Sequence, residues 1–445
     1  MKTIRFYLLF FSVLILVLVS NVRVFAEGIA EREVLSNGLV LMHSEKKTLP
    51  VVNVVLAVKA GSFLDPAEKA GLANLTADLM NEGTAKRSSM NISDEIEFVG
   101  GQLNLSGGLD YITITLTVLK KDLELGFDLL SDIILNPAFD PEEVIRRMTM
   151  AKGYITMMND EPGVVVSNAF KKAVYGKHPY GMPVEGIERT IDNITDQDIV
   201  DFHKSYYTPN NSIMAVVGDV SREEIRSIID KYFKGWQMKE IRAEPLPDLK
   251  YGDKPLVIKI NKNIEQSNII LGHLGMRRDD PDYYAATVMN YILGGGGFAS
   301  RLMDNIRDNK GLSYDVHSYF ASNKQAGSFQ AGLQTKNNTA NEAIDEILKE
   351  MERIRKEPVT DKELSDAKAY LTGSFPLRLD SNSKIAGFLV AVEFFGLGIN
   401  YVDDYKKFID AVTKDDILRV AQKYLAPDKY ILVVVGDIDK TSLKY

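Results

Sequence analysis

Two stretches of this sequence decide its fold: residues 195–219 read TDQDIVDFHKSYYTPNNSIMAVVGD, and residues 413–437 read TKDDILRVAQKYLAPDKYILVVVGD. Each begins with Thr-x-x-Asp, continues as a helical pattern, passes a proline and ends in an apolar run closed by Gly-Asp. Identities at a constant offset of 218 residues, without a gap, indicate an internal duplication. The shared residues are Thr195 and Thr413, Asp198 and Asp416, Ile199 and Ile417, Tyr206 and Tyr424, Pro209 and Pro427, Gly218 and Gly436, and Asp219 and Asp437.

The order of strand and helix patterns around this repeat indicates the fold class. Residues 33–60 and 111–119 alternate apolar and polar side chains, as half-buried strands do, and helical patterns follow them. Because strands and helices do not alternate regularly, we expect an α+β fold of two homologous lobes. Each lobe is predicted to have a mostly antiparallel sheet with helices packed on one face. The lobes would be arranged around a cleft, a usual place for a ligand.

The length and composition bound the domain count and the chemistry. A chain of 445 residues is too long for one ordinary core. We predict one domain at 27–240, a proline-containing charged linker at 241–255 and a second domain at 256–445. The chain has no cysteine, so it has neither a thiol nucleophile nor a thiolate metal site.

The first 26 residues are predicted to be a signal peptide. Lys2 and Arg5 precede an apolar run, and Val24-Phe25-Ala26 fits a small-residue cleavage site. The alternative is an uncut membrane anchor, but the apolar run is short. Cleavage implies a periplasmic or otherwise exported bacterial envelope protein. Removing its three basic residues changes the net charge from −8 to −11, which argues against nucleic acid as a partner.

Residues 293–314, LGGGGFASRLMDNIRDNKGLSY, form a candidate binding corner. Gly294, Gly295, Gly296 and Gly297 carry no Cβ, so another chain can approach their backbone closely. Arg307 falls in the last turn of the helix that follows, and Tyr314 falls at the start of the next strand. This combination suits a site that holds a peptide backbone. On residue types alone, the alternative is a loop, an Arg that compensates the helix dipole and a packed Tyr.

The helix of this corner is predicted to span 298–310. Phe298, Leu302, Met303 and Ile306 would form its apolar side. Gly311 would end it as a C-terminal cap, and a strand would begin at 312.

These features together resemble the pitrilysin or insulinase-type zinc peptidases, the group that includes the mitochondrial processing peptidases. The resemblance covers essentially all of residues 30–445. It rests on motifs that occur in order along the chain: Gly71-Leu72-Ala73 with Gly83-Thr84, His178-Pro179-Tyr180-Gly181, Asn290-Tyr291-Ile292-Leu293-Gly294-Gly295-Gly296, Ser300-Arg301-Leu302, Arg307, and Gly311-Leu312-Ser313-Tyr314.

The zinc signature of that family is missing here. The family places His-x-x-Glu-His after Gly-Leu-Ala, so that two His on one helix face bind Zn²⁺ and the Glu acts as general base. The matching positions are Asn74 and Asp78 for the His and Ala77 for the Glu. A further ligand, a Glu about 75 residues on in the family, corresponds to Tyr154-Ile155. We therefore expect no metal bound by this chain, because one amide and one carboxylate make a poor zinc site.

Histidines elsewhere do not replace that site. The chain has five, and no two lie within one helical turn of each other. A lone His is usually not a ligand. The five are His43, His178, His203, His273 and His317; His178 is expected to be structural, His203 half exposed on a helix, and the last two have no assigned role.

The resemblance implies a role for Arg307 and Tyr314, which match residues of the family. In the family, an Arg and a Tyr seven residues apart contact substrate near the scissile bond, and Arg307 with Tyr314 has this spacing. An Arg fork and a Tyr hydroxyl can hold a carbonyl or a developing oxyanion. The family also includes heterodimers in which one subunit supplies zinc and the other supplies this pair and the glycine loop.

The resemblance thus implies a non-zinc, substrate-binding subunit of a heterodimeric envelope peptidase that cleaves unfolded peptides. Its partners would be a zinc-bearing homologous subunit and an unfolded peptide, with a homodimer possible in isolation. Zinc is expected on the partner only. The alternatives are a non-catalytic peptide-binding or scaffold protein of the same fold and, least favoured, a self-sufficient peptidase with metal at Asn74 and Asp78.

Overall fold

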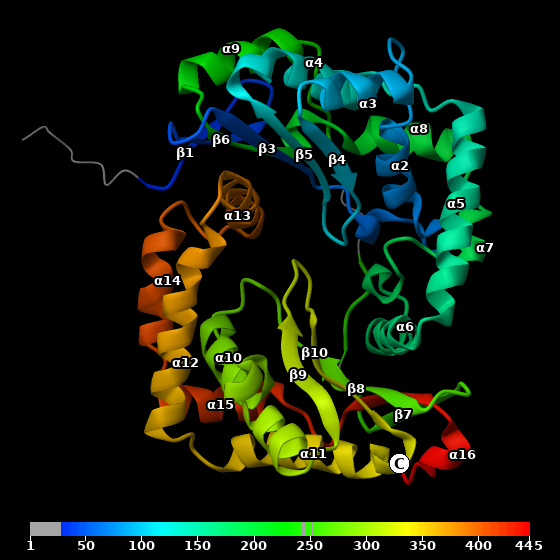
Figure 1. The fold of residues 1–445 in the computed structure, drawn as a ribbon, viewed down its shortest axis with the longest axis vertical. Helices are drawn as coiled ribbons and strands as arrows, with labels where there is room; N and C mark the ends of the chain where they lie inside the picture. The colour runs from blue at the N-terminus through cyan, green and yellow to red at the C-terminus, as the bar shows by residue number, and fades with distance from the viewer. Residues whose placement is uncertain (1–27, 242–245, 251) are drawn as a thin grey trace, which may run out of the picture.

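The computed structural model describes residues 28–241, 246–250 and 252–445. The predicted signal peptide at 1–26 and part of the predicted linker at 241–255 lie outside these residues and stay predictions. Two sheets with their helices lie one above the other in Figure 1, and they fall in the two predicted halves. Within the described part of the chain, no helix has both the length and the apolar character needed to cross a bilayer.

The first half is built on a sheet with strand order β1-β2-β6-β3-β5-β4. Its pairs are antiparallel except for β2 and β6, which run parallel. Its elements are β1 (Glu31–Val34), β2 (Val40–Glu45), β3 (Val51–Val58), α2 (Leu72–Met80), α3 (Ser89–Phe98), β4 (Gln102–Ser106), β5 (Ile112–Leu119), α4 (Leu123–Leu135), α5 (Pro141–Asp160), α6 (Pro162–Tyr175), α7 (Glu188–Ile191), α8 (Asp196–Tyr206), β6 (Ser212–Gly218) and α9 (Arg222–Tyr232).

The second half is built on a sheet with strand order β7-β11-β8-β10-β9, in which only β7 and β11 are parallel. Its helices include two π-helical segments, η6 and η8. Its elements are β7 (Leu256–Asn261), β8 (Gln266–Leu274), α10 (Tyr283–Asn290), η6 (Tyr291–Gly295), η7 (Gly297–Ala299), η8 (Met303–Asn309), β9 (Ser313–Ala321), β10 (Ser328–Lys336), α11 (Ala340–Lys356), α12 (Asp361–Ser374), α13 (Asn382–Phe395), α14 (Tyr401–Asp410), α15 (Lys414–Tyr424), β11 (Ile431–Gly436) and α16 (Ile438–Thr441).

The repeated stretches occupy equivalent places. Strand β6 pairs parallel with β2 and antiparallel with β3, and β11 pairs in the same way with β7 and β8. The repeated Thr and Asp form a capping box at the start of α8 and again at α15. Gly218 and Gly436 end the two strands where a Cβ would collide with the neighbouring strand. The α+β fold with two related, mostly antiparallel sheets is therefore confirmed.

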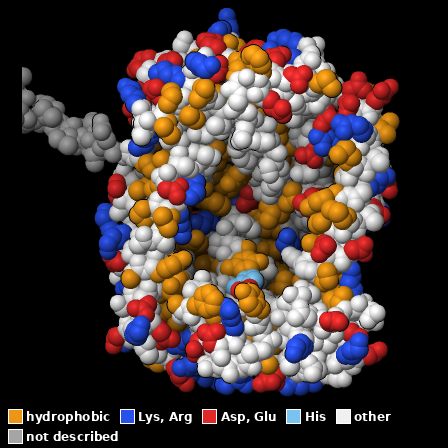
Figure 2. Space-filling view, in the orientation of Figure 1, with side chains coloured by type: hydrophobic (Ala, Val, Ile, Leu, Met, Phe, Trp, Pro, Cys, Tyr) orange, Lys and Arg blue, Asp and Glu red, His pale blue; other side chains and the backbone are white. Residues whose placement is uncertain are grey.

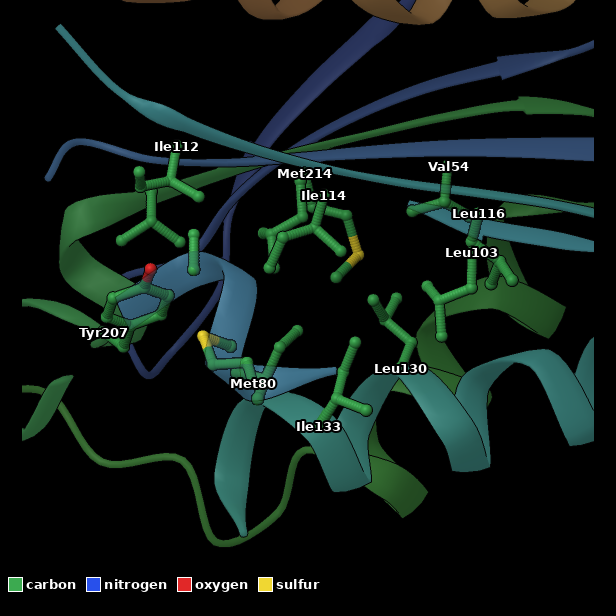
Figure 3. Close-up of a cluster of buried hydrophobic side chains, with 14 of the residues drawn as sticks. Val54, Met80, Leu103, Ile112, Ile114, Leu116, Leu130, Ile133, Tyr207 and Met214 are labelled. Carbon is green, nitrogen blue, oxygen red and sulfur yellow. The ribbon is translucent and has the colours of Figure 1, made fainter. Parts of the chain in front are cut away.

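One face of each sheet is covered by helices of its own half. In the first half, alternate strand residues such as Val54, Ile114 and Met214 pack with Met80 of α2 and with α4 (Figure 3). In the second half, Phe329 and Leu432 pack with α10, α11 and α15 in the same way. The prediction of helices on one face is thus correct for each half's own helices.

The opposite face of each sheet is covered by a helix from the other half. Helix α13 of the second half buries Ala386 and Leu389 against Ala57 and Ala215 of the first sheet. Helix α6 of the first half buries Phe170 against the second sheet, which contributes Leu274, Val433 and Val435. Figure 1 shows α13 below the first sheet and α6 beside β8. The two halves therefore exchange one covering helix each.

A predicted helix start is wrong in the first half. The pattern predicts a helix from about Pro66 to Asn81, but α2 begins at Leu72 after two short 3-10 turns. Gly71 has φ +101°, a left-handed conformation that interrupts a helix. The carboxylate of Asp65 accepts hydrogen bonds from the backbone N–H of Gly71 and Ala73 at 2.8 and 2.9 Å, which fixes the new start.

Candidate functional site

The structure brings Arg307 and Tyr314 together at the predicted corner. Arg307 lies on η8 and Tyr314 near the start of β9, and Gly311 between them has φ +63° and turns the chain. The guanidinium carbon of Arg307 lies 4.7 Å from the centre of the Tyr314 ring. The same carbon lies 4.5 Å from the centre of the Phe298 ring. The guanidinium therefore makes a cation–π contact with each of two aromatic rings.

The edge of this guanidinium remains available. Among the described residues, the contacts of Arg307 are the two rings and an ion pair with Asp308 at 3.9 Å, and no hydrogen bond occupies its N–H groups. Its side chain is 25% exposed. A planar fork whose donors make no hydrogen bond within the described residues can bind a carbonyl or carboxylate.

The position of Phe298 differs from the prediction. The pattern placed it on the buried side of a helix that began at Phe298, but that helix begins at Arg301, and Phe298 lies in the 3-10 turn η7. Leu302, Met303 and Ile306 are buried as predicted, whereas Phe298 is 69% exposed. Gly297, immediately before Phe298, has a left-handed φ of +56°, which is not a helical conformation. Phe298 therefore lies in a turn that precedes the helix.

The four glycines divide into two groups. Gly294 is buried, and a Cβ there would lie 2.5 Å from Oγ of Ser318 on β9. Cβ atoms on Gly295 and Gly296 would collide with Asn290 and Tyr291 of the same segment. A Cβ on Gly297 would meet nothing within 4 Å. Three glycines therefore allow close packing within the protein, and the binding role predicted for the loop remains a prediction.

A groove of about 610 Å³ adjoins the corner. It is lined by residues of β8, β9 and β10 and by Val166 of α6, and Tyr314, which is 83% exposed, is among the lining residues. Its other lining residues include Gln266, Asn268, His317, Gln334 and Lys336. Figure 2 shows this face of the molecule hollowed between the halves, with hydrophobic side chains along the walls.

The degenerate zinc side is closed by contacts within the protein. Asn74 and Asp78 share one face of α2 and form a weak hydrogen bond, Nδ2 to Oδ2, at 3.4 Å. The backbone of Gly107, after β4, lies so close that a Cβ there would be 2.2 Å from Oδ1 of Asn74. Ala77, at the position of the general base, is fully buried.

The distal ligand position offers no replacement. Ile155 of α5 points into the first hydrophobic core, and Tyr154 is 46% exposed. Glu82, just after α2, accepts hydrogen bonds from Arg146 and Arg147 of α5, with Arg147 Nε at 2.7 Å. Burial raises the pKa of Asp78, and the charge of Arg147 opposes that rise. A cation from α5 thus already compensates the acidic groups on this face of α2.

Zinc does not fit this set of residues. One amide, one carboxylate and a buried Ile supply too few ligands, and a neighbouring guanidinium repels a second cation. Within residues 28–241, 246–250 and 252–445, no group of three or more His, Asp or Glu side chains is arranged to hold a metal ion.

The buried histidines have structural contacts. Nδ1 of His178 accepts a hydrogen bond from the backbone N–H of Tyr180, as expected for a turn residue. His273 is buried, with Nδ1 2.8 Å from the carbonyl of Leu274 and Nε2 accepting from the N–H of Ala426 at 3.1 Å. Burial lowers the pKa of His273 to about 4, so it is neutral at pH 7.

His203 and His317 differ in exposure. His203 is partly buried, with Nε2 2.9 Å from the carbonyl of Ile134, and burial lowers its pKa to about 4. His317 lines the groove beside Tyr314, and its side chain is 53% exposed.

Comparisons with known proteins place the chain in a family. The family model "Insulinase (Peptidase family M16)" matches residues 40–187, and the model "Peptidase M16 inactive domain" matches residues 193–371. A zinc protease of Mycobacterium leprae is 30% identical over 413 residues, which cover 91% of each chain. The chain belongs to the insulinase (peptidase M16) family. A zinc protease of Streptomyces coelicolor is 28% identical to this M16 chain over 407 residues, 89% of this chain and 88% of that protein.

Solved structures have the same M16 fold. The peptidase M16 inactive domain from Pseudomonas fluorescens superposes with a TM-score of 0.86 at 28% identity, over 92% of this chain and 97% of that one. A protease from Helicobacter pylori has a TM-score of 0.85 over 92% of this chain and 99% of that one, and at 23% identity it supports the fold alone. In this M16 chain, the model described as an inactive domain covers both Arg307 and Tyr314.

Proposed function

We propose that this M16 chain is the non-zinc, substrate-binding subunit of a heterodimeric envelope metallopeptidase that cleaves unfolded peptides. The observation that carries the proposal is the contrast between two places. Arg307 contacts two exposed rings and makes no hydrogen bond within the described residues, whereas the ligand face of α2 lacks His and Glu and is closed by protein contacts. A subunit that binds peptide but needs a partner for hydrolysis would have this combination.

The corner would act on the peptide backbone. The N–H groups of Arg307 would donate to a peptide carbonyl, and the Tyr314 hydroxyl would donate to an oxyanion that develops there. The exposed backbone of Gly295 and Gly297 would allow the peptide to pass close to the loop. The edge strand β4, which lies beside α2, would add the peptide as a further strand.

The partner would be a homologous subunit that carries the zinc ligands this chain lacks. It would supply the zinc chemistry, and this chain would supply the corner at Arg307. The predicted signal peptide supports an envelope location for the pair, and we propose that a homodimer is possible in isolation. The alternative is a non-catalytic peptide-binding or scaffold protein of the same fold, and a pure scaffold has no use for an Arg that contacts two rings and makes no hydrogen bond within the described residues.

Cleavage of a quenched fluorescent unfolded peptide tests the proposal. The chain alone, a zinc-bearing M16 homologue from the same organism alone, and their mixture are compared with and without chelator. We expect cleavage only in the mixture and its loss with chelator. Equal cleavage by the homologue alone would contradict the proposal and favour the scaffold.

A further inference from the structure

The exposed Phe298 has no role in the proposal so far. Its side chain is 69% exposed. Its ring contacts Arg307, with the guanidinium carbon 4.5 Å from the ring centre. The contact therefore involves a residue that the corner needs.

The backbone around Phe298 is held in place. Ser300 donates to the carbonyl of Gly297 from its backbone N–H at 2.9 Å and from its hydroxyl at 2.7 Å. Ser300 is itself buried, and the next residue, Arg301, forms a two-point ion pair with Glu363 at 2.6 and 3.1 Å. The turn that presents Phe298 is thus anchored on both sides.

This geometry has a consequence for Arg307. An Arg on a helix end has many rotamers, and a single exposed ring restricts them little. Contacts with two rings, Phe298 and Tyr314, restrict the guanidinium more than one contact would. Asp308 is 3.9 Å away, which is beyond hydrogen-bond distance. Within the described residues, the two rings are therefore the groups that hold the guanidinium.

We infer that Phe298 is a positioning residue for peptide binding, acting through Arg307. It holds the guanidinium in the orientation in which its edge meets a peptide carbonyl or carboxylate. The inference rests on the proposed function, because it gives Phe298 a part in the same corner.

The variants Phe298→Ala, Phe298→Tyr, Arg307→Ala and the double variant test it in the complex with the zinc-bearing homologue. Phe98→Ala is the matched control, because Phe98 is 92% exposed on α3, away from the corner. We expect Phe298→Ala to lower kcat/KM about tenfold and Phe298→Tyr less than twofold, because a tyrosine ring restores the stacking. On an Arg307→Ala background, Phe298→Ala should have no further effect.

A second readout does not depend on cleavage. In ¹H–¹⁵N spectra of arginine side chains, the Nε–H signal of Arg307, assigned from Arg307→Lys, should carry a ring-current shift that Phe298→Ala reduces and Phe298→Tyr keeps. An unchanged signal in Phe298→Ala would overturn the inference.

The kinetic outcomes separate the two proposals. If Arg307→Ala lowers cleavage but Phe298→Ala does not, the positioning role is overturned and the proposed function stands. If the two losses multiply in the double variant, Phe298 acts without Arg307, which also overturns the inference. If Arg307→Ala leaves cleavage unchanged, the proposed function fails, and the positioning role in peptide binding fails with it.

Discussion

In the first half α2 lies beside the edge strand β4, and in the second half α10 and η6 lie beside the edge strand β9. These places are equivalent in the duplicated fold, but the polar groups around them are used differently. On α2, Asn74 bonds to Asp78, and Arg147 compensates the acidic groups. Near β9, Arg307 is stacked but not hydrogen-bonded within the described residues. Equivalent positions in one fold can thus be closed by internal contacts, as on α2, or can carry a side chain without internal hydrogen bonds among the described residues, as at Arg307.

The comparison is tested most directly by removing one side chain from the Arg307 corner and one from α2. We expect Arg307→Ala to lower kcat/KM of the mixed subunits by about 10²–10³-fold, because removing an oxyanion donor has effects of that size. Asn74→Ala should change it less than twofold. Peptide cleavage at matched subunit concentrations measures both, with melting temperatures to show that the variants fold. A comparable loss in Asn74→Ala would mean that the closed side also contributes.

The anchor of the corner can be tested through stability. Arg301→Ala should lower the free energy of unfolding by about 2 kcal/mol, because it removes the ion pair with Glu363 and leaves that carboxylate with Thr360 as its remaining donor. Urea denaturation at pH 7 measures this. The exposed pair Lys362 and Asp366 is the control, and Lys362→Ala should cost less than about 0.5 kcal/mol.

The same pair has a defined pH dependence. Arg301 and the N-cap Thr360 donate to Glu363 and lower its pKa to about 2 despite partial burial. A carboxylate with a lowered pKa stabilises the fold above its unfolded pKa, and that stabilisation is lost as the pH falls toward 2. Arg301→Ala should therefore flatten the decrease in stability between pH 4.5 and 2.

Mild acid should weaken the second half through His273. The unfolded side chain binds a proton near pH 6.5, but the folded one does so only near pH 4, because burial and the Ala426 N–H disfavour the charged form. The fold should therefore lose about 2 kcal/mol between pH 7 and pH 5 from this residue. Urea denaturation of wild type and His273→Gln at both values measures it. His317→Gln, at an exposed ring, should keep the wild-type loss.

The smallest expected effect is that of added zinc, which would have to bind at Asn74 and Asp78 of α2. Zinc in excess over the protein should shift the melting temperature of this chain alone by less than about 1 °C, because a ligand that does not bind the folded state does not stabilise it. Differential scanning fluorimetry with and without zinc and chelator measures this. A larger stabilisation that Asp78→Ala abolishes would revive the metal site at Asn74 and Asp78.

Much of the fold could be predicted because the sequence contains the same helix–strand pattern twice. The capping boxes at Thr195 and Thr413 and the apolar runs after Pro209 and Pro427 indicated equivalent helices and strands, and β6 and β11 indeed occupy equivalent places. The exchange of α6 and α13 could not be predicted. An apolar helix face shows that a helix packs, but it does not show which sheet it covers.

The site was predicted in part. The spacing of Arg307 and Tyr314 indicated a pair, and the structure brings the two side chains together. Phe298 was assigned to the core because its spacing to Leu302 fits a helix, and sequence periodicity could not show that Gly297 turns the chain before that helix begins. A glycine run immediately before a large aromatic was the available signal that Phe298 is presented on a turn.

The exchanged helices also determine what would happen if the chain were cut between its halves. A fragment ending near residue 240 would carry α6 with nothing to cover and would expose Ile213, Ala215 and Val217 to water. The complementary fragment would expose the partners of α6. Each piece would hold the missing layer of the other, so the two should reassemble without a covalent link. The two halves are thus complementary in the way that the fragments of a split protein are, although here one chain joins them.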